Sequence, residues 1–520
     1  MMAFADTEAS RAGDWLRARG IEGKSAPVQS YQLYIGGKWE DPASGEWFET
    51  VNPFDERPWA RIPRCNAADV DRAVAAAAKA FGEGGWADSL PAERGRLLLA
   101  AADCLEARSR ALAELETRDT GKRIVESEPQ IRYMAAWFRY FGGLADKIEG
   151  RVIPLDRDDV LNYTLREPLG VVAAVTPWNS PIMIAVWKIA PALAAGNTVV
   201  IKPSEHASAS TLALMEVFEA AGFPPGVVNA VTGLPEEAGA PLVSHPDVAK
   251  VSFTGSDVGG GHINRAAADS FKHVTMELGG KSPQIVFADA DLDSAVNGVI
   301  MGIFLSNGQS CVAGSRLIVQ SSIADAFLGR LVEAVGGLRF GDPMDESTQV
   351  GPIANRMQFD KVLGFVERAK AAGAKCLCGG APGTAAGIGS GMFLEPTIFT
   401  GITPDMEIWR DEVFGPVLAV TRFDDEAEAV RAANDSPYGL AAGAWTSDIR
   451  RGHRMAKLLK SGTVYVNTYR HVSVASPVGG FKRSGFGREN GLEVMAEYTQ
   501  TKSVWIGLSE IANNPLKPQG

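Results

Sequence analysis

The stretch of sequence that decides the fold is GVVAAVTPWNSPIMIAVWKIAPALAAGNTVVIKPS, residues 170–204. It begins and ends with short runs of mostly β-branched and small apolar residues, at 170–177 and 196–204, and glycine and proline bound both runs. Such runs are typical of buried β-strands. The two runs bound the most apolar segment of the chain.

The same alternation continues on both sides of this stretch. Helical or strand patterns are found at residues 67–83, 93–122, 209–226, 226–233 and 248–256. Gly121 and Gly222 mark the ends of two of the helices. A second series, at 282–304 and 316–335, repeats the pattern and indicates a second α/β domain. Strands that alternate with helices of about ten to fifteen residues predict parallel sheets.

One segment departs from this pattern. Residues 149–171 alternate polar and apolar side chains and carry charges in the middle, which predicts an antiparallel hairpin. The last strand-like run is at residues 496–508. Because an isolated hairpin is barely stable in water, we expect both pieces to pack on something, with a second subunit as one candidate.

Composition narrows the class of protein. The chain has 520 residues, 46% of them hydrophobic, and a formal net charge of −11. The length fits about two to four domains, and the acidic balance gives no electrostatic reason to bind nucleic acid. No membrane association is expected, because polar residues and prolines interrupt the most apolar segment: Pro177, Asn179, Pro181, Lys188 and Pro191.

The cysteines point to a reducing compartment. Their number is odd and their spacing is not that of a disulfide framework: Cys65, Cys104, Cys311, Cys376 and Cys378. No histidine cluster accompanies them, so no metal site is expected. The N-terminus has no secretory pattern, and a short helix is expected around Trp15 and Leu16. These features predict a cytoplasmic location.

Two strand ends carry residues suited to a nucleotide. Thr254-Gly255-Ser256 follows a strand and precedes a helical run from about His262, so its N–H groups can bind a phosphate. The spacing is not GxGxxG, and a plain glycine turn remains an alternative. Lys202 and Glu205 follow another strand and can hold ribose hydroxyls, unless they belong to a solvated loop.

Together these stretches form a known set of motifs. In chain order they are TPWNSP (176–181), KPSE (202–205), FTGS (253–256), ELGGKSP (277–283), GQSC (308–311), EVFGPV (412–417) and GGFKRSGFGRENG (479–491). Their order and spacing resemble the NAD(P)-dependent aldehyde dehydrogenase superfamily. The resemblance covers roughly residues 30–508.

The resemblance implies an α/β fold with a Rossmann-like cofactor domain, an α/β catalytic domain and a small antiparallel oligomerisation element. The expected NAD-binding domain comprises residues 1–148 and 169–279, the catalytic domain 280–481, and the oligomerisation element 149–168 and 494–520. In the resembled family the last strand extends a neighbour's sheet, so a homodimer or homotetramer is implied.

The resemblance also implies the catalytic residues. Cys311 is the nucleophile, Glu277 the general base, and Asn179 forms an oxyanion hole with the backbone N–H of Cys311. These residue types suit the chemistry, because a thiolate converts the aldehyde into a tetrahedral thiohemiacetal whose oxyanion the two N–H groups stabilise. Hydride transfer then leaves a thioester, which a carboxylate base hydrolyses with water.

The expected cofactor is NAD, with NADP as the alternative. The residues implied for cofactor binding are Trp178, Lys202, Glu205, Gly255, Ser256, Glu412 and Phe414. Glu205 favours NAD, because a carboxylate accepts a hydrogen bond from a ribose hydroxyl and repels a 2′-phosphate, although Lys202 partly offsets this preference. Asp257 departs from the family pattern and would repel a nearby pyrophosphate unless its side chain points away.

A further set of residues is expected in the substrate pocket or the proton path. They are Ser180, Met183, Trp187, Lys188, Arg470, His471, Val472, Val478 and Glu489. Ser180, Val472 and Val478 replace frequent aromatic residues, which indicates a wider tunnel or neutral drift in an apolar wall. Arg470 at the tunnel mouth suits an aromatic or anionic aldehyde, or else forms a surface salt bridge.

Two other functions remain open at this point. In a CoA-acylating semialdehyde dehydrogenase, coenzyme A takes the acyl group in place of water, but an intact Glu277 favours water. A non-catalytic structural relative would lack one of the catalytic residues, and all of them are present. The sequence therefore favours oxidation of a small-molecule aldehyde to a carboxylic acid, and it leaves the aldehyde unidentified.

Overall fold

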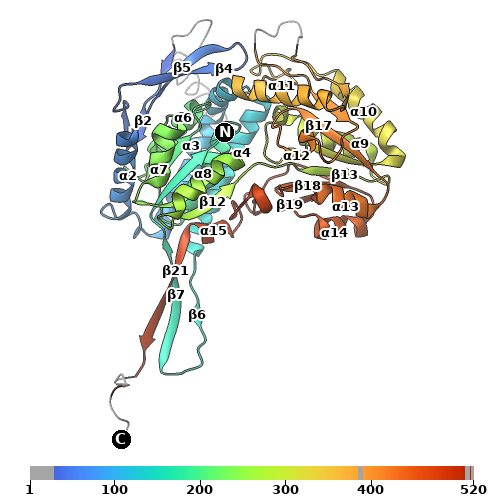
Figure 1. Ribbon diagram of the computed structural model, residues 1–520. Helices are drawn as coiled ribbons and strands as arrows, with labels where there is room; N and C mark the ends of the chain where they lie inside the picture. Colours follow the sequence, from blue (N-terminus) through green and yellow to red (C-terminus); the bar gives the residue numbers. More distant parts are fainter. Residues whose placement is uncertain (1–27, 384–390, 510–515, 517–520) are drawn as a thin grey trace, which may run out of the picture.

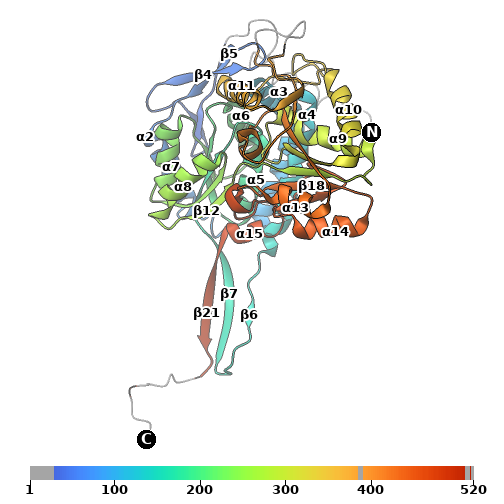
Figure 2. The ribbon, with the colours of Figure 1, turned by 45° about the vertical axis from the view of Figure 1, so that its right-hand side comes forward.

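The computed structural model describes residues 28–383, 391–509 and 516. Two α/β lobes lie side by side, and a thin β-ribbon projects from below them (Figure 1). A rotated view shows the ribbon extending well beyond both lobes (Figure 2). The short helix expected around Trp15 and Leu16 lies outside the described residues.

The first lobe is built on an eight-stranded sheet with the order β20-β12-β11-β8-β9-β10-β2-β3. Its parallel core consists of β8 (Val171–Thr176), β9 (Thr198–Pro203), β10 (Val228–Ala230), β11 (Val248–Thr254) and β12 (His273–Glu277). The antiparallel edges are β2 (Leu33–Ile35), β3 (Lys38–Glu40) and β20 (Gly485–Phe486). The predicted parallel sheet is confirmed.

The strand order of this lobe reverses at β8, which is where a ligand crevice is expected. The chain passes from β8 to β9 on one side and later to β11 on the other side of β8. Ligands of open α/β sheets bind where the strand order reverses, at the carboxyl ends of the strands. The carboxyl ends of β8 and β11 lead to Asn179 and Ser256, which are therefore placed at the same edge of the sheet.

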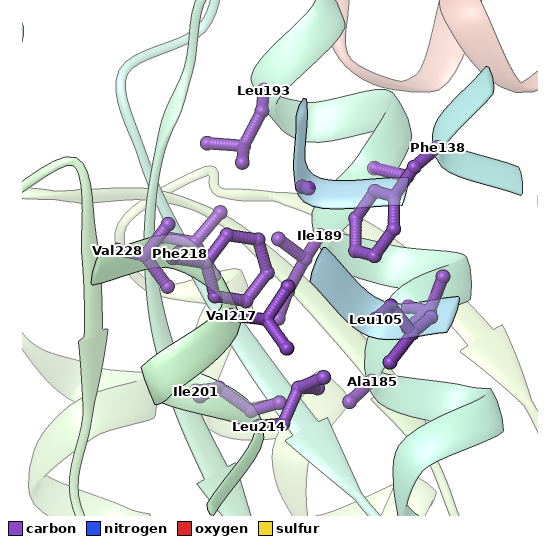
Figure 3. Close-up of a cluster of buried hydrophobic side chains, with 14 of the residues drawn as sticks. Leu105, Phe138, Ala185, Ile189, Leu193, Ile201, Leu214, Val217, Phe218 and Val228 are labelled. Carbon is purple, nitrogen blue, oxygen red and sulfur yellow. The ribbon is translucent and has the colours of Figure 1, made fainter. Parts of the chain in front are cut away.

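Helices cover both faces of the first sheet. One face carries α2 (Ala67–Phe81) and α7 (Ala240–Ser244), and the other carries α3 (Pro91–Thr120), α4 (Ile124–Leu144), α5 (Pro181–Ala194) and α6 (Ala209–Ala221). Side chains of α3, α4, α5 and α6 meet those of β9 and β10 in one apolar cluster (Figure 3). Burial of this apolar surface, worth about 25 cal/mol per Å², holds the helices on the sheet.

One predicted helix boundary is wrong. The helix expected from about His262 is α8 (Asp257–Ala268) and begins five residues earlier. Ser256 is its N-cap, because the Ser256 hydroxyl accepts a hydrogen bond of 3.1 Å from the Gly259 N–H. The free N–H groups of the first turn consequently lie directly beside Gly255, where a phosphate was expected.

The second lobe is built on a seven-stranded sheet with the order β15-β16-β17-β14-β13-β18-β19. Its strands are β13 (Pro283–Val286), β14 (Arg316–Gln320), β15 (Lys375–Cys378), β16 (Thr397–Thr400), β17 (Val417–Phe423), β18 (Ala441–Trp445) and β19 (Thr463–Val466). All pairs are parallel except β15 with β16. Its longer helices are α9 (Leu292–Ile303), α10 (Ala324–Gly336), α11 (Arg356–Ala371), α13 (Glu426–Asn434) and α14 (Ile449–Leu458).

The projecting ribbon confirms the predicted hairpin. It consists of β6 (Val152–Ile153), β7 (Val160–Pro168) and β21 (Thr499–Gly507), all antiparallel, with β7 in the middle. Its apolar side chains are unusually exposed: Val152 by 73% and Trp505 by 60%. A small sheet of β1 (Gln29–Ser30), β5 (Arg57–Pro63) and β4 (Trp47–Asn52) was not predicted.

The described residues were searched for membrane-spanning helices and for metal-binding clusters. No helix among residues 28–383 and 391–509 is both long and apolar enough to cross a membrane. Within the same part of the chain, no three side chains of histidine, cysteine, aspartate or glutamate lie together in a way that could hold a metal ion.

Candidate active site

The three expected catalytic residues come from different parts of the fold. Asn179 lies in the loop after β8, Glu277 is the last residue of β12, and Cys311 follows the short helix η3 (Leu305–Gly308) of the second lobe. The Asn179 Nδ2 donates a hydrogen bond of 3.0 Å to the carbonyl of Gln309. This contact joins the two lobes two residues before Cys311.

The loop before Cys311 is held in an uncommon backbone conformation. Ser306 and Asn307 both have φ of +53°, in the left-handed region that few non-glycine residues adopt. The Asn307 amide compensates by donating to the carbonyls of Gly351 (2.8 Å) and Pro352 (2.9 Å). A Cβ at Gly308 would overlap the Gly415 carbonyl, so this position requires glycine. Strain of this kind persists only where the surroundings fix the loop.

The Cys311 thiol is protonated at neutral pH. Loss of solvation raises its pKa to about 12, and the negative charges of Glu412 and Glu277 add to this effect. Arg470 acts in the opposite direction but does not compensate. A thiol is a poor nucleophile, so reaction at this sulfur requires a base that accepts its proton.

Glu277 has the properties of such a base. Its carboxyl is buried, and Oε1 has no hydrogen-bond partner in the described part of the chain. Burial first, and then the charge of Glu489, raise the pKa of Glu277 well above its ordinary value, whereas Lys188 and Arg488 oppose the rise. A carboxylate whose pKa approaches neutrality takes protons more effectively than an ordinary one.

Lys188 and Glu489 lie behind this carboxyl. They form a buried ion pair, and the Lys188 Nζ also donates to the Ser252 hydroxyl at 3.2 Å. The backbone of Glu489 pairs with that of Val478 through two hydrogen bonds of 2.7 Å. A residue expected in the proton path and one expected in the substrate wall are thus held by the same loop.

The residues expected to bind the cofactor gather at the carboxyl ends of the first sheet and at the junction of the lobes. Phe414, with φ of +58°, packs edge-on against Trp178 at a ring distance of 5.3 Å. Glu412 Oε1 accepts a hydrogen bond of 2.8 Å from the Gly280 N–H, and burial raises the Glu412 pKa to about 7. The two lobes therefore meet around Trp178, Glu412 and Phe414.

The crevice fits a dinucleotide in its donor set. Lys202 is buried, its pKa is lowered by burial, and its amine forms one hydrogen bond, of 3.1 Å to the Pro203 carbonyl, leaving two N–H groups for a ligand. Glu205, partly exposed, lies nearby in the same loop. Ser256 leads into the first turn of α8, which adds backbone N–H donors, whereas the Gly255 N–H already donates to the Glu277 carbonyl at 3.1 Å.

The negative charge of Asp257 is compensated by neighbouring side chains. Its Oδ2 accepts hydrogen bonds from Arg483 (2.6 Å) and from the Tyr438 hydroxyl (3.3 Å). The repulsion expected between Asp257 and a pyrophosphate is therefore reduced by a neighbouring guanidinium.

The expected substrate residues fall into two groups. Met183, Val472 and Val478 are partly buried against the cluster that contains Trp187. The Trp187 ring stacks on Trp137 at 5.9 Å and an interplanar angle of 9°.

The second group of substrate residues is polar. Arg470 donates to the carbonyls of Met301 (3.4 Å) and Leu305 (2.8 Å) at the end of α9, and it forms no ion pair with a described carboxylate. His471 is exposed. Ser180 is buried and bonds to Lys122 at 2.9 Å. Lys122 was not predicted for the site, because no motif in the sequence connects it with a residue 58 positions away.

A half-buried thiol, a buried carboxyl whose Oε1 has no hydrogen-bond partner among the described residues and two α/β lobes that meet beside a strand-order reversal are typical of cysteine-dependent oxidoreductases. The aldehyde dehydrogenase family model matches residues 39–504. The chain belongs to the aldehyde dehydrogenase family.

Several relatives match nearly the whole chain. A (Z)-2-((N-methylformamido)methylene)-5-hydroxybutyrolactone dehydrogenase of Acinetobacter baylyi is 47% identical, with 93% of this chain and 98% of the relative covered. A betaine aldehyde dehydrogenase of Brucella anthropi is 45% identical over 94% of this chain and 99% of the relative. The solved NAD⁺ complex of an aldehyde dehydrogenase from Bacillus cereus has a TM-score of 0.91 at 42% identity, covering 95% and 99% of the two chains.

These relatives confirm the predicted reaction class. The chain is an NAD-dependent enzyme that oxidises an aldehyde, and NAD is its cofactor. The CoA-acylating and non-catalytic alternatives are not favoured, because the relatives are a betaine aldehyde dehydrogenase and related dehydrogenases of this family.

Proposed function

We propose that the oxidation proceeds through a covalent intermediate on Cys311, with Glu277 as the base and Asn179 in the oxyanion hole. The contact between Asn179 and the Gln309 carbonyl supports this assignment above all, because it holds the amide beside the Cys311 loop. The raised pKa of the Cys311 thiol makes a base necessary. The charges of two carboxyls, Glu412 and Glu277, act on that thiol, and Glu412 already accepts a hydrogen bond from the Gly280 N–H.

In the first half of the reaction, Glu277 accepts the thiol proton and Cys311 Sγ bonds to the aldehyde carbon. The carbonyl oxygen becomes an oxyanion, which the Asn179 Nδ2–H and the Cys311 backbone N–H stabilise by about 3–4 kcal/mol per donor. NAD held by the crevice residues would supply the hydride acceptor, which would leave the substrate carbon on Cys311 at the oxidation level of a thioester.

Between the two halves, Glu277 gives up the thiol proton through the Lys188–Glu489 pair and becomes a carboxylate again. In the second half, it accepts a proton from water while the water oxygen attacks the thioester carbon. The same two N–H groups stabilise the second oxyanion. Its collapse breaks the carbon–sulfur bond, returns Cys311 as a thiolate and releases the carboxylic acid. Lys188 and Glu489, which lie behind Glu277, are proposed to pass its proton onward.

The cofactor is proposed to lie along the carboxyl ends of β8, β9 and β11. Lys202 and Glu205 hold the adenosine ribose, the first turn of α8 at Gly255 and Ser256 holds the pyrophosphate, and Glu412 holds the nicotinamide ribose. Trp178 and Phe414 enclose that end. The carboxylate of Glu205 favours NAD over NADP.

We also propose an anionic or aromatic aldehyde as the substrate class, taken in through the opening lined by Met183, Val472 and Val478. Arg470 supports this proposal, because its charge acts on Cys311 and only its Nη1 is engaged by the described residues. His471 lies beside it at the surface. The site of action is proposed to be the cytoplasm.

The ribbon of β6, β7 and β21 is proposed as the assembly arm of a homodimer or homotetramer. The outer strands β6 and β21 leave unpaired backbone groups, and apolar side chains along the arm are exposed. An exposed apolar edge of this kind is a template for pairing with another chain.

The function is tested with a panel of aldehydes, NAD and the purified enzyme, following NADH by its absorbance. Cys311→Ala should abolish NADH production while NAD binding, measured by calorimetry, and the circular dichroism spectrum stay unchanged. Addition of coenzyme A should leave turnover unchanged. NADH production by Cys311→Ala would refute the covalent mechanism, and strong stimulation by coenzyme A would refute hydrolysis by water.

A further inference from the structure

We propose that Lys122 orients Ser180 and Gln130 as a pair of hydrogen-bond donors in the substrate pocket, so that the enzyme prefers aldehydes with a second, acceptor oxygen. The inference rests on the proposed active site, in which Ser180 is the neighbour of Asn179. Lys122 lies in the turn between α3 and α4 and is a positioning residue, whereas Ser180 and Gln130 determine specificity.

The Lys122 ammonium is fully engaged. Its Nζ donates to Glu116 Oε1 at 2.9 Å, to Gln130 Oε1 at 2.8 Å and to Ser180 Oγ at 2.9 Å. An ammonium has three N–H groups and no acceptor, so all of its donors are used. Both Ser180 Oγ and Gln130 Oε1 must therefore act as acceptors toward Lys122.

This leaves the Ser180 proton available. Ser180 is the N-cap residue of α5, but its side chain does not cap the helix. Glu116 does so instead, because its Oε2 accepts a hydrogen bond of 3.1 Å from the Ile182 N–H. The Ser180 hydroxyl accepts from Lys122, and no acceptor for its own O–H is found among the described residues. That proton is free for an acceptor beside Asn179.

Gln130 is fixed in a similar way. Because lysine can only donate, the atom facing Lys122 must be the carbonyl oxygen Oε1, and the amide Nε2 must face the other side. On that side its nearest polar contact is the Met183 sulfur at 3.2 Å, a weak acceptor. Met183 is partly exposed and belongs to the proposed pocket wall. The Gln130 N–H groups are consequently donors toward the pocket.

The cluster selects for an acceptor and not for charge. The Lys122 ammonium is paired with the Glu116 carboxylate, and both side chains are almost fully buried, with exposures of 4% and 0%. The pair has no net charge, so a neutral carbonyl or ester oxygen satisfies Ser180 and Gln130 as a carboxylate does. An aldehyde without such an oxygen leaves these donors unpaired when it displaces water.

The test compares aldehydes of similar length: pentanal, methyl 4-oxobutanoate and 4-oxobutanoate. The wild-type kcat/KM should be about tenfold higher or more for both oxygenated aldehydes than for pentanal. In Ser180→Ala and in Gln130→Met, the ratio of kcat/KM for methyl 4-oxobutanoate to that for pentanal should fall toward one, mainly through KM.

The role of Lys122 is tested with a variant that leaves no buried charge unpaired. The double variant Lys122→Met/Glu116→Gln removes both charges, and it should lose the preference for methyl 4-oxobutanoate while still oxidising pentanal. Lys122→Arg, which keeps the donors, should retain more of the preference than the double variant. A purely structural role would lower kcat/KM for all three aldehydes by the same factor.

The outcomes separate this inference from the proposed function. Equal wild-type kcat/KM for all three aldehydes, or a preference for 4-oxobutanoate alone, would overturn the inference while the covalent mechanism stands. An unchanged ratio in Ser180→Ala would overturn it as well. Failure to oxidise any of the three aldehydes would refute it too, and a rate independent of Cys311 would refute the proposed function instead.

Discussion

Lys188 and Glu489 form a buried ion pair, although one lies in the middle of α5 and the other in the loop after β20, 301 positions further along the chain. Their exposures are 0% and 2%. The pair acts on Glu277 with opposite signs, since Glu489 raises its pKa and Lys188 lowers it. Burial is the main cause of the raised Glu277 pKa, and these two opposite charges adjust it.

Breaking this pair should change both stability and the pH profile. Lys188→Met leaves Glu489 buried and unpaired, which should lower the free energy of unfolding by about 3–5 kcal/mol. It also removes the charge that opposes the rise in the Glu277 pKa, so the pH–rate profile should move to higher pH. Glu489→Gln should move it to lower pH. Denaturant titration and pH profiles of kcat measure the two effects, and coinciding profiles would contradict the coupling.

Replacing the proposed base should slow turnover. Glu277→Gln should lower kcat by about 10²-fold or more at neutral pH, because neither the thiol nor the water can then lose its proton to this side chain. Steady-state NADH production measures the change. Glu497→Gln serves as a control, since Glu497 also acts electrostatically on Glu277 but is not proposed to take a proton. An unchanged rate in Glu277→Gln would remove Glu277 from the mechanism.

Glu277→Gln should also stabilise the folded protein at higher pH. The folded-state pKa of Glu277 is raised, so the folded protein binds more protons than the unfolded chain between the ordinary and the raised pKa. The stability that this group contributes is present below its ordinary pKa and is lost as pH rises through the raised value. Glu277→Gln should therefore raise Tm relative to the wild type more at pH 8 than at pH 4. A difference independent of pH would contradict the raised pKa.

The thiol should react slowly in the enzyme without cofactor. With a Cys311 pKa of about 12, the thiolate fraction rises about tenfold for each pH unit at neutral pH, and alkylation by iodoacetamide should follow it. Glu412→Gln removes a charge that raises this pKa and should speed alkylation at pH 8. Mass spectrometry of the peptide that contains Cys311 measures both rates. Alkylation that does not vary with pH would contradict the assignment.

A separate test asks whether Arg470, at the proposed entrance of the substrate pocket, recognises a negatively charged substrate. Arg470→Ala should raise KM for 4-oxobutanoate by about tenfold for each 1.4 kcal/mol lost, with KM for pentanal little changed. The exposed Arg330 on α10 provides a control for loss of surface charge. Equal effects on the two aldehydes would mean that Arg470 has a structural role, in which it holds the segment from Met301 to Leu305 through hydrogen bonds to their two carbonyls.

The proposed assembly arm is tested by measuring the mass of the particle in solution. Trp505→Arg places a charge on an exposed apolar side chain of β21 and should lower the molar mass measured by light scattering. Met357→Arg, at a position of similar exposure on α11, should leave the mass unchanged. The same low mass in the wild type and in Trp505→Arg would contradict assembly through the arm.

Local sequence patterns were sufficient to predict much of the fold. The strands β8 and β9 were recognised by their β-branched runs, and α6 ends at Gly222, which adopts the left-handed conformation expected of a glycine after a helix. The helix α5 gave no amphipathic pattern, because nearly all of its side chains are buried and no polar face interrupts them. The early start of α8 depends on the Ser256 cap, which the glycines after it obscured.

Only part of the candidate site could be predicted from the sequence. The motifs of the family identified Cys311, Glu277 and Asn179, whose roles remain proposals. The cluster around Lys122 could not be predicted, because its contacts join α3, α4 and the start of α5 and depend on how the helices pack. Long-range packing leaves no periodic trace in the sequence.

The exposed ribbon also bears on the fate of newly made chains. In the proposed assembly, a subunit that has folded its two lobes but has not met a partner still displays Trp505, Val152 and two free strand edges. Chaperones and proteases recognise such surfaces, and unpaired edges promote aggregation at high concentration. Production of this enzyme should therefore depend on how quickly subunits meet, so that slow synthesis, low temperature or dilution changes the yield of usable protein without altering the chemistry of any single site.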